Sequence, residues 1–222
     1  MIEFFSIDNI AFTVYGYGVS YLELFGLITG TIAVVLSALA NLWSWVIGIV
    51  NVVLSFFLFY QVQLYPDMFL QVFFFVTNVI GWWRWANPKE GEADRHKELK
   101  VSWMDRRQLT ITFTVCLLGT FLMAMFARNL NTWLPAIFSK PSASPFLDSF
   151  ITVMSILATF YMVQKKIECW IIWVLIDIVA TYVYYIRDIR FYSIQYFILT
   201  IIAAFAVWNW IKEYRGYQKV AV

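Results

Sequence analysis

The longest uncharged run in the chain decides what kind of protein it can form. No charged side chain occurs between Glu23 and Asp67. As one helix this run would be roughly 64 Å long at about 1.5 Å per residue, about twice the hydrocarbon thickness of a membrane. We therefore expect the run to cross a membrane twice, with its turn at the polar Asn41.

Composition agrees with a membrane protein. Hydrophobic residues make up 62% of the chain and charged residues 14%, and the mean hydropathy is +0.71, whereas a soluble domain is nearer half apolar and a quarter charged. A net charge of +2 indicates no nucleic-acid partner. Cys116 and Cys169 are too few for a disulfide framework or a zinc site. Acids Glu3 and Asp8 stand where a signal peptide would carry bases, so we expect no cleaved leader.

The charge pattern predicts an all-α membrane protein with seven transmembrane helices. Besides the two spans in the first run, apolar spans are expected near residues 68–83, 108–127, 149–164, 170–186 and 191–211. The expected organisation is an extracytoplasmic segment 1–20, a three-helix bundle 21–86, a cytoplasmic linker 87–107, a connecting helix 108–127, an extracytoplasmic loop 128–148, a second three-helix bundle 149–211 and a cytoplasmic tail 212–222.

The basic residues predict the orientation of these spans. With seven spans, twelve of the 16 Lys and Arg residues fall on one side. The positive-inside rule assigns that side to the cytoplasm, which leaves the N-terminus outside and the C-terminus inside. Six tryptophans near this boundary are typical of an aromatic belt: Trp82, Trp83, Trp85, Trp103, Trp208 and Trp210.

Two stretches of the sequence repeat one pattern at a shift of about 125 residues. In each, a Trp and a polar residue mark one helix and a Trp-x-Trp ends the next: Trp45, Asn51 and Trp83-Arg-Trp85 in the first, and Trp170, Asp177 and Trp208-Asn-Trp210 in the second. A lone helix between two triplets gives both the same orientation. The pattern therefore predicts a 3+1+3 arrangement, a parallel repeat of the kind found in sugar-efflux SWEET proteins.

Polar side chains inside the spans supply the candidate binding site, because each is costly in lipid unless it faces a cavity or a partner. The spacings within each helix put several of them on common faces. The candidate substrate-binding residues are Asn51, Gln71, Asn78, Trp170, Trp173, Asp177, Tyr184 and Gln195. Aromatic rings stack on a flat ring and amides bond hydroxyl groups, which suits a small, partly aromatic solute. The alternative is that the amides bond neighbouring helices and the aromatics only pack.

Enzyme chemistry is disfavoured. The only histidine, His96, lies in the charged linker, so no Ser-His-Asp or Cys-His arrangement can form inside the membrane. No metal-ligand spacing or phosphate-binding loop is present in the sequence. We expect no catalytic residue, no bound metal and no cofactor.

Several motifs together resemble the PnuC family of bacterial vitamin transporters. They occur in order over most of the chain: Phe4-Phe5-Ser6-x-x-Asn9-Ile10, Gly48-x-x-Asn51, Gln61-Val-Gln63-Leu-Tyr65, Leu70-Gln71-Val-Phe73-Phe74, Gly81-Trp82-x-x-Trp85, Trp170-x-x-Trp173 and Tyr196-x-Ile198-Leu199-Thr200. The resemblance implies the 3+1+3 fold, a homotrimer in a bacterial inner membrane, and facilitated diffusion of nicotinamide riboside. It also implies a cytoplasmic kinase that phosphorylates and so traps the imported substrate.

Two departures from the family pattern bear on the substrate. Asp177 stands where Asn is expected, and Ala206 where Gly is common. Family members also carry thiamine or riboflavin. A carboxylate in a low-dielectric site favours the fixed cations nicotinamide riboside and thiamine, and favours neutral riboflavin least. A non-transporting ligand sensor or complex subunit is the alternative of another class.

Overall fold

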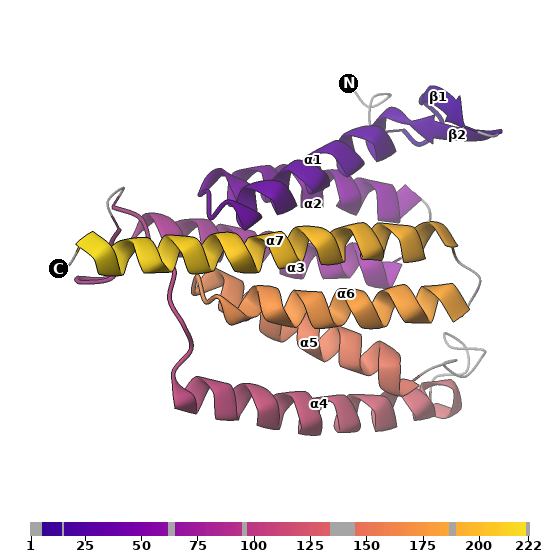
Figure 1. Cartoon of the computed structure of the whole chain (residues 1–222). Helices are drawn as coiled ribbons and strands as arrows, with labels where there is room; N and C mark the ends of the chain where they lie inside the picture. Colours follow the sequence, from indigo (N-terminus) through magenta and orange to yellow (C-terminus); the bar gives the residue numbers. More distant parts are fainter. Residues whose placement is uncertain are drawn as a thin grey trace. The chain divides into compact units, whose positions relative to one another are not determined.

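The computed structural model describes residues 6–14, 16–61, 65–94, 97–133, 145–186 and 190–220. The chain divides into two compact units: Met1–Lys100 with Tyr217–Val222, and Val101–Gly216. Figure 1 shows that almost all of its regular structure is helical. The helices are α1 Tyr21–Ala38, α2 Trp43–Gln61, α3 Tyr65–Ala86, α4 Arg106–Trp133, α5 Pro145–Val163, α6 Glu168–Ile186 and α7 Arg190–Val220.

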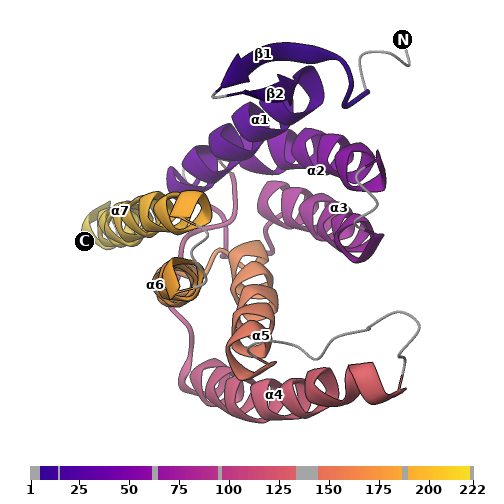
Figure 2. The ribbon, with the colours of Figure 1, turned by 90° about the vertical axis from the view of Figure 1, so that its right-hand side faces the viewer.

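Each unit is built from neighbouring antiparallel helices. In the first, α1 packs on α2 and α2 on α3. In the second, α4 packs on α5 and α5 on α6, an order that can be followed in Figure 2. The Ser193 hydroxyl of α7 donates to the Thr181 carbonyl of α6 at 3.0 Å, which joins α7 to the same unit.

The prediction of seven helices is confirmed for the described part of the chain, and the helices run further than the apolar spans. α4 continues to Trp133, α5 already begins at Pro145, and α7 continues to Val220. Proline at the first helical position is favoured rather than disruptive, because the amide it lacks would have had no partner there. Five helices are long and apolar enough over their described residues to cross a membrane: α1, α2, α4, α5 and α7.

A β-hairpin that the sequence did not suggest precedes α1. Strands β1 Ile10–Val14 and β2 Tyr17–Ser20 pair antiparallel around Gly16, whose φ of 86° suits glycine. Ser20 then caps α1 in a capping box with Glu23: the Glu23 amide donates to the Ser20 hydroxyl at 3.2 Å, and the Ser20 amide to the Glu23 carboxylate at 2.8 Å. The hairpin thus fixes where the first helix begins.

The turns between α1 and α2 and between α5 and α6 have the same hydrogen bonds. In the first, the amides of Ala40 and Asn41 donate to the carbonyls of Ser37 and Leu36, both at 2.9 Å. In the second, the amides of Lys165 and Lys166 donate to the carbonyls of Met162 and Tyr161, at 2.9 and 3.0 Å. Ala40 and Lys165 both have a φ of 55°. This is the Schellman ending of a helix, made here without glycine.

A buried pair of tryptophans stands at one end of each unit. Trp45 and Trp85 meet edge to face at 5.2 Å between ring centroids, and Trp170 and Trp210 do so at 5.9 Å. Trp85 and Trp210 are both 0% exposed. These two were expected in the aromatic belt, and that expectation is wrong, because helix packing within each unit covers them. The other four tryptophans of the expected belt are exposed: Trp82, Trp83, Trp103 and Trp208.

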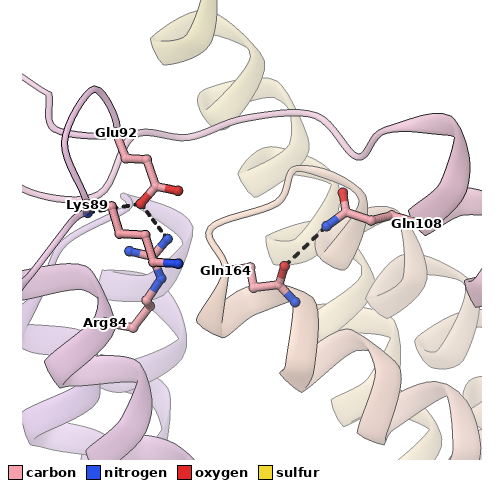
Figure 3. Close-up of polar contacts among 5 residues, drawn as sticks. All are labelled: Arg84, Lys89, Glu92, Gln108 and Gln164. Atoms are coloured by element: carbon pink, nitrogen blue, oxygen red, sulfur yellow. Dashed lines mark hydrogen bonds and ion pairs between the residues drawn. The ribbon is translucent and has the colours of Figure 1, made fainter.

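Polar contacts outside the spans are drawn in Figure 3. In the first unit, Arg84 of α3 forms an ion pair with Glu92 at 2.7 Å, and the Lys89 amide donates to the same carboxylate at 3.0 Å. The bond from Arg84 holds the pKa of Glu92 below its ordinary value. In the second unit, the Gln108 side chain donates to that of Gln164 at 3.2 Å, which joins the start of α4 to the end of α5.

Gly81 supplies the space that the first tryptophan pair occupies, which gives a test of the packing. A Cβ built there would lie 2.6 Å from three carbons of the Trp45 ring. Gly81→Ala should therefore lower the free energy of unfolding by about 1–3 kcal/mol through overpacking. Gly26→Ala is the matched control, because its Cβ would meet nothing within 4 Å. Melting curves of purified protein in detergent measure both, and equal melting temperatures for the two variants would contradict the packing described.

Candidate functional site

One face of α6 carries the strongest group of candidate residues. Trp170, Trp173 and Asp177 follow one another at spacings of three and four, so they lie along one side of the helix. Trp170 is 3% exposed, Asp177 is 4% exposed, and Trp173 is half-buried. All three side chains on this face are therefore mostly shielded from solvent.

Polar atoms on this face lack hydrogen-bond partners among the described residues. The indole nitrogens of Trp170 and Trp173 are buried without a hydrogen-bond partner among the described residues. The Asp177 carboxylate also has no partner there, since the described contact of this residue is its backbone carbonyl accepting from the Thr181 hydroxyl at 2.6 Å. A buried polar group without a partner is costly, so a ligand that supplied partners would gain binding energy.

In the first unit, Asn51 and Asn78 are engaged in helix packing. The Asn51 amide donates to the Gly26 carbonyl at 2.7 Å and to the Thr29 hydroxyl at 3.2 Å, which joins α2 to α1. The Asn78 amide donates to the Phe74 carbonyl at 2.8 Å, and its oxygen lies against the backbone of Gly48. The two bonds of Asn51 correspond to the alternative considered for intramembrane amides, namely interhelical contacts, whereas the bond of Asn78 stays within α3.

The other candidates differ in exposure. Gln71 is buried in α3, and Gln195 of α7 is exposed. The side chain of Tyr184 and the whole of His96 lie outside the described residues. The eight candidates are divided between the units: Asn51, Gln71 and Asn78 belong to the first, and the other five to the second.

Two unpartnered groups at the start of α2 were missed as site candidates. The Ser44 hydroxyl and the Trp45 indole nitrogen are both buried without a hydrogen-bond partner among the described residues. Trp45 matches Trp170 in the sequence repeat, and both lack a partner for the same indole nitrogen. The repeat was the signal that could have singled out Trp45. Ser44 has no such signal, because a serine in an apolar helix usually bonds its own backbone.

Comparison with known proteins decides the family. A sequence family described as nicotinamide mononucleotide transporter matches residues 20–212, which covers both units. The chain belongs to this family. It is accordingly a multi-pass membrane transporter, in agreement with the apolar helices described above.

Relatives of known name span nearly its whole length. The chain is 31% identical to the nicotinamide riboside transporter PnuC of Escherichia coli over 96% of both chains. It is 22% identical to the riboflavin/roseoflavin transporter RibM of Streptomyces davaonensis, again over 96% of both. Its fold is similar to the crystal structure of the vitamin B3 transporter PnuC, with a TM-score of 0.64 at 19% identity over 88% of this chain and 83% of the other.

The contacts of Asn51 and Asp177 predict opposite effects on stability. Asn51→Ala removes bonds between α1 and α2 and should lower the free energy of unfolding by about 1 kcal/mol. Asp177→Asn keeps the side-chain shape and breaks no described bond, so the melting temperature should stay the same or rise. Thermal unfolding in detergent without substrate compares the two. A fall for Asp177→Asn as large as that for Asn51→Ala would mean that the carboxylate holds the bundle together.

Proposed function

We propose that this protein takes up nicotinamide riboside by facilitated diffusion across a bacterial inner membrane. The relative named as a nicotinamide riboside transporter is 31% identical over 96% of both chains, and this observation carries the proposal. The unpartnered carboxylate on α6 adds chemical support, because nicotinamide riboside has a fixed positive charge on its ring.

The proposed binding groups contact the substrate in three ways: by stacking, by charge pairing and by hydrogen bonding. Trp170 and Trp173 offer aromatic surface and unused indole N–H donors to the pyridinium ring and its carboxamide. Asp177 balances the ring charge, which in a low-dielectric site is worth more than in water. Tyr184 and Gln195, the other candidates of the second unit, are proposed for the remaining contacts, to the carboxamide and the ribose hydroxyls.

Riboflavin is the second candidate, because the relative named as a riboflavin/roseoflavin transporter is 22% identical over the same share of the chain. Riboflavin is uncharged and larger, so the buried carboxylate of Asp177 would gain it nothing and would still require partners. Thiamine, a fixed cation, shares the argument from charge. A ligand sensor is the alternative of another class, and the match to a transporter family over residues 20–212 argues against it.

The proposed architecture is a parallel repeat of two three-helix bundles joined by α4. Helix bounds support it: α2 begins at Trp43 and α6 at Glu168, 125 positions later, and α3 and α7 begin at Tyr65 and Arg190 with the same shift. The matched Schellman turns and tryptophan pairs follow the same interval. The bundles then comprise residues 21–86 and 149–211, with the N-terminus outside and the linker 87–107 and the tail 212–222 in the cytoplasm.

Passive transport followed by trapping is the scheme that requires no ion-coupling groups in the protein. No group of three or more His, Cys, Asp or Glu residues is gathered among the described residues to bind a coupling metal ion. Asp177 is a single buried acid with no acidic neighbour on its face of α6, which disfavours a proton relay along that helix. Net uptake would come from a cytoplasmic kinase that phosphorylates the imported nucleoside. A homotrimer is the proposed assembly, on the family resemblance.

Flux in proteoliposomes tests this proposal. Labelled nicotinamide riboside should enter until its inside and outside concentrations are equal, and entrapped kinase with ATP should then drive further uptake. Protein-free liposomes are the control. Accumulation above the outside concentration in response to a proton or sodium gradient would contradict facilitated diffusion, and binding without any flux would favour a sensor.

A further inference from the structure

The start of α6 is attached to a segment that crosses its end. Residues 101–105, here called the strap, run beside the turn between α5 and α6. The Ser102 amide donates to the Lys165 carbonyl at 3.1 Å, and the Ile167 amide donates to the Ser102 carbonyl at 3.0 Å. These two bonds form a parallel β-bridge within the second unit. The strap therefore holds the backbone immediately before α6.

Glu168, in the first turn of α6, makes the strongest of these attachments. Its two carboxylate oxygens accept from the Met104 amide at 2.9 and 3.0 Å. Hydrogen bonds to an ionised acceptor are roughly twice as strong as neutral ones. The adjacent Lys166 ammonium donates to the Trp103 carbonyl at 3.0 Å. The backbone of the strap is thus bonded at Ser102, Trp103 and Met104 to residues at or just before the start of α6.

Apolar burial makes the attachment rigid. Val101 and Met104 of the strap are buried, as are Ile167 and Cys169 at the start of α6. Trp103 meets Tyr214 of α7 edge to face at 6.4 Å. A strap that is bonded to the start of α6 and also contacts α7 can fix the rotation of α6 about its own axis, whereas a single surface hydrogen bond could not.

The corresponding turn of the first unit has no carboxylate at the position that matches Glu168. The residue that matches Glu168 is Trp43, which is 64% exposed and whose indole ring cannot accept such a bond. The backbone bonds of Ala40, Asn41 and Ser44 stay within that turn and its own helix. The carboxylate is therefore a feature of α6, the helix that carries Trp173 and Asp177.

We infer that Glu168 is a positioning residue of the substrate site: by holding the strap against the first turn of α6, it sets the rotation that aims Trp173 and Asp177 at the substrate. The inference rests on the proposed function, since it assumes that this face of α6 binds the transported solute. Glu168 precedes Trp173 by five residues and Asp177 by nine, and a stiff helix transmits a rotation over such a length with little loss.

The test compares Glu168→Ala with Glu168→Gln, which keeps one oxygen acceptor in nearly the same place. Met104→Pro is the second variant, because it removes the donating amide and leaves Glu168 intact. Glu90→Ala is the matched control at an exposed acid outside the strap and the site. Each protein is reconstituted to measure the KM and maximal rate of nicotinamide riboside uptake. Hydrogen exchange at Met104 and the ¹⁹F signal of fluorotryptophan at position 173, without substrate, report on the strap and on α6.

Glu168→Ala and Met104→Pro should raise KM roughly tenfold, the lower end of what a hydrogen bond to a charged group is worth. The maximal rate should stay within about twofold, and the ¹⁹F signal of residue 173 should shift. Glu168→Gln should restore most of the affinity, and Glu90→Ala should match the wild type. For Glu168→Ala, faster exchange at Met104 with an unchanged KM and an unshifted signal would overturn the inference. If the wild-type protein does not transport nicotinamide riboside while the ¹⁹F signal of residue 173 still shifts in Glu168→Ala, the proposed function is overturned but the positioning of α6 by Glu168 is not.

Discussion

The hydrocarbon interior of a membrane offers no hydrogen-bond partners, and both the fold and the candidate site of the protein depend on this constraint. Every polar group inside a span must find a partner in the chain or remain available for a ligand. Asn51 and Asn78 meet the requirement within the first unit, by bonding neighbouring backbone at 2.7 and 2.8 Å. Asp177 and the indole nitrogen of Trp173 do not meet it among the described residues. The contrast separates side chains whose amides are already bonded to the backbone from side chains that can bind a solute.

The same constraint explains why some features could be predicted from the sequence. The uncharged run before Asp67 had to form two spans, and the face shared by Trp170, Trp173 and Asp177 follows from helical spacing alone. Contacts between helices do not follow from spacing. Asn51 looks like Asp177 in sequence, as a polar residue in an apolar helix, and only the position of Gly26 on α1 shows that its amide is engaged. The burial of Trp85 and Trp210 likewise depends on their edge-to-face partners.

Backbone features of the ends were the least predictable. The hairpin at Ile10–Val14 and Tyr17–Ser20 has mixed composition, and Pro145 begins a helix although proline inside one would break it. The strap lies in a charged linker, whose composition suggested solvent exposure, yet Val101 and Met104 are buried. Two apolar residues in so short a segment establish no periodicity, so the sequence cannot distinguish the strap from a solvated loop without its partner, here the carboxylate of Glu168.

In the proposed function, the buried carboxylate of Asp177 on α6 pairs with the positive charge of the transported vitamin. Nicotinamide riboside and its reduced dihydro form are close in size and shape, but only the oxidised form has a charged ring. Calorimetric titration of the purified wild-type protein with each form isolates the charge. The oxidised form should bind at least about tenfold more tightly, as expected for a hydrogen-bonded or paired charge. Equal affinities would contradict it and would return a neutral substrate to first place.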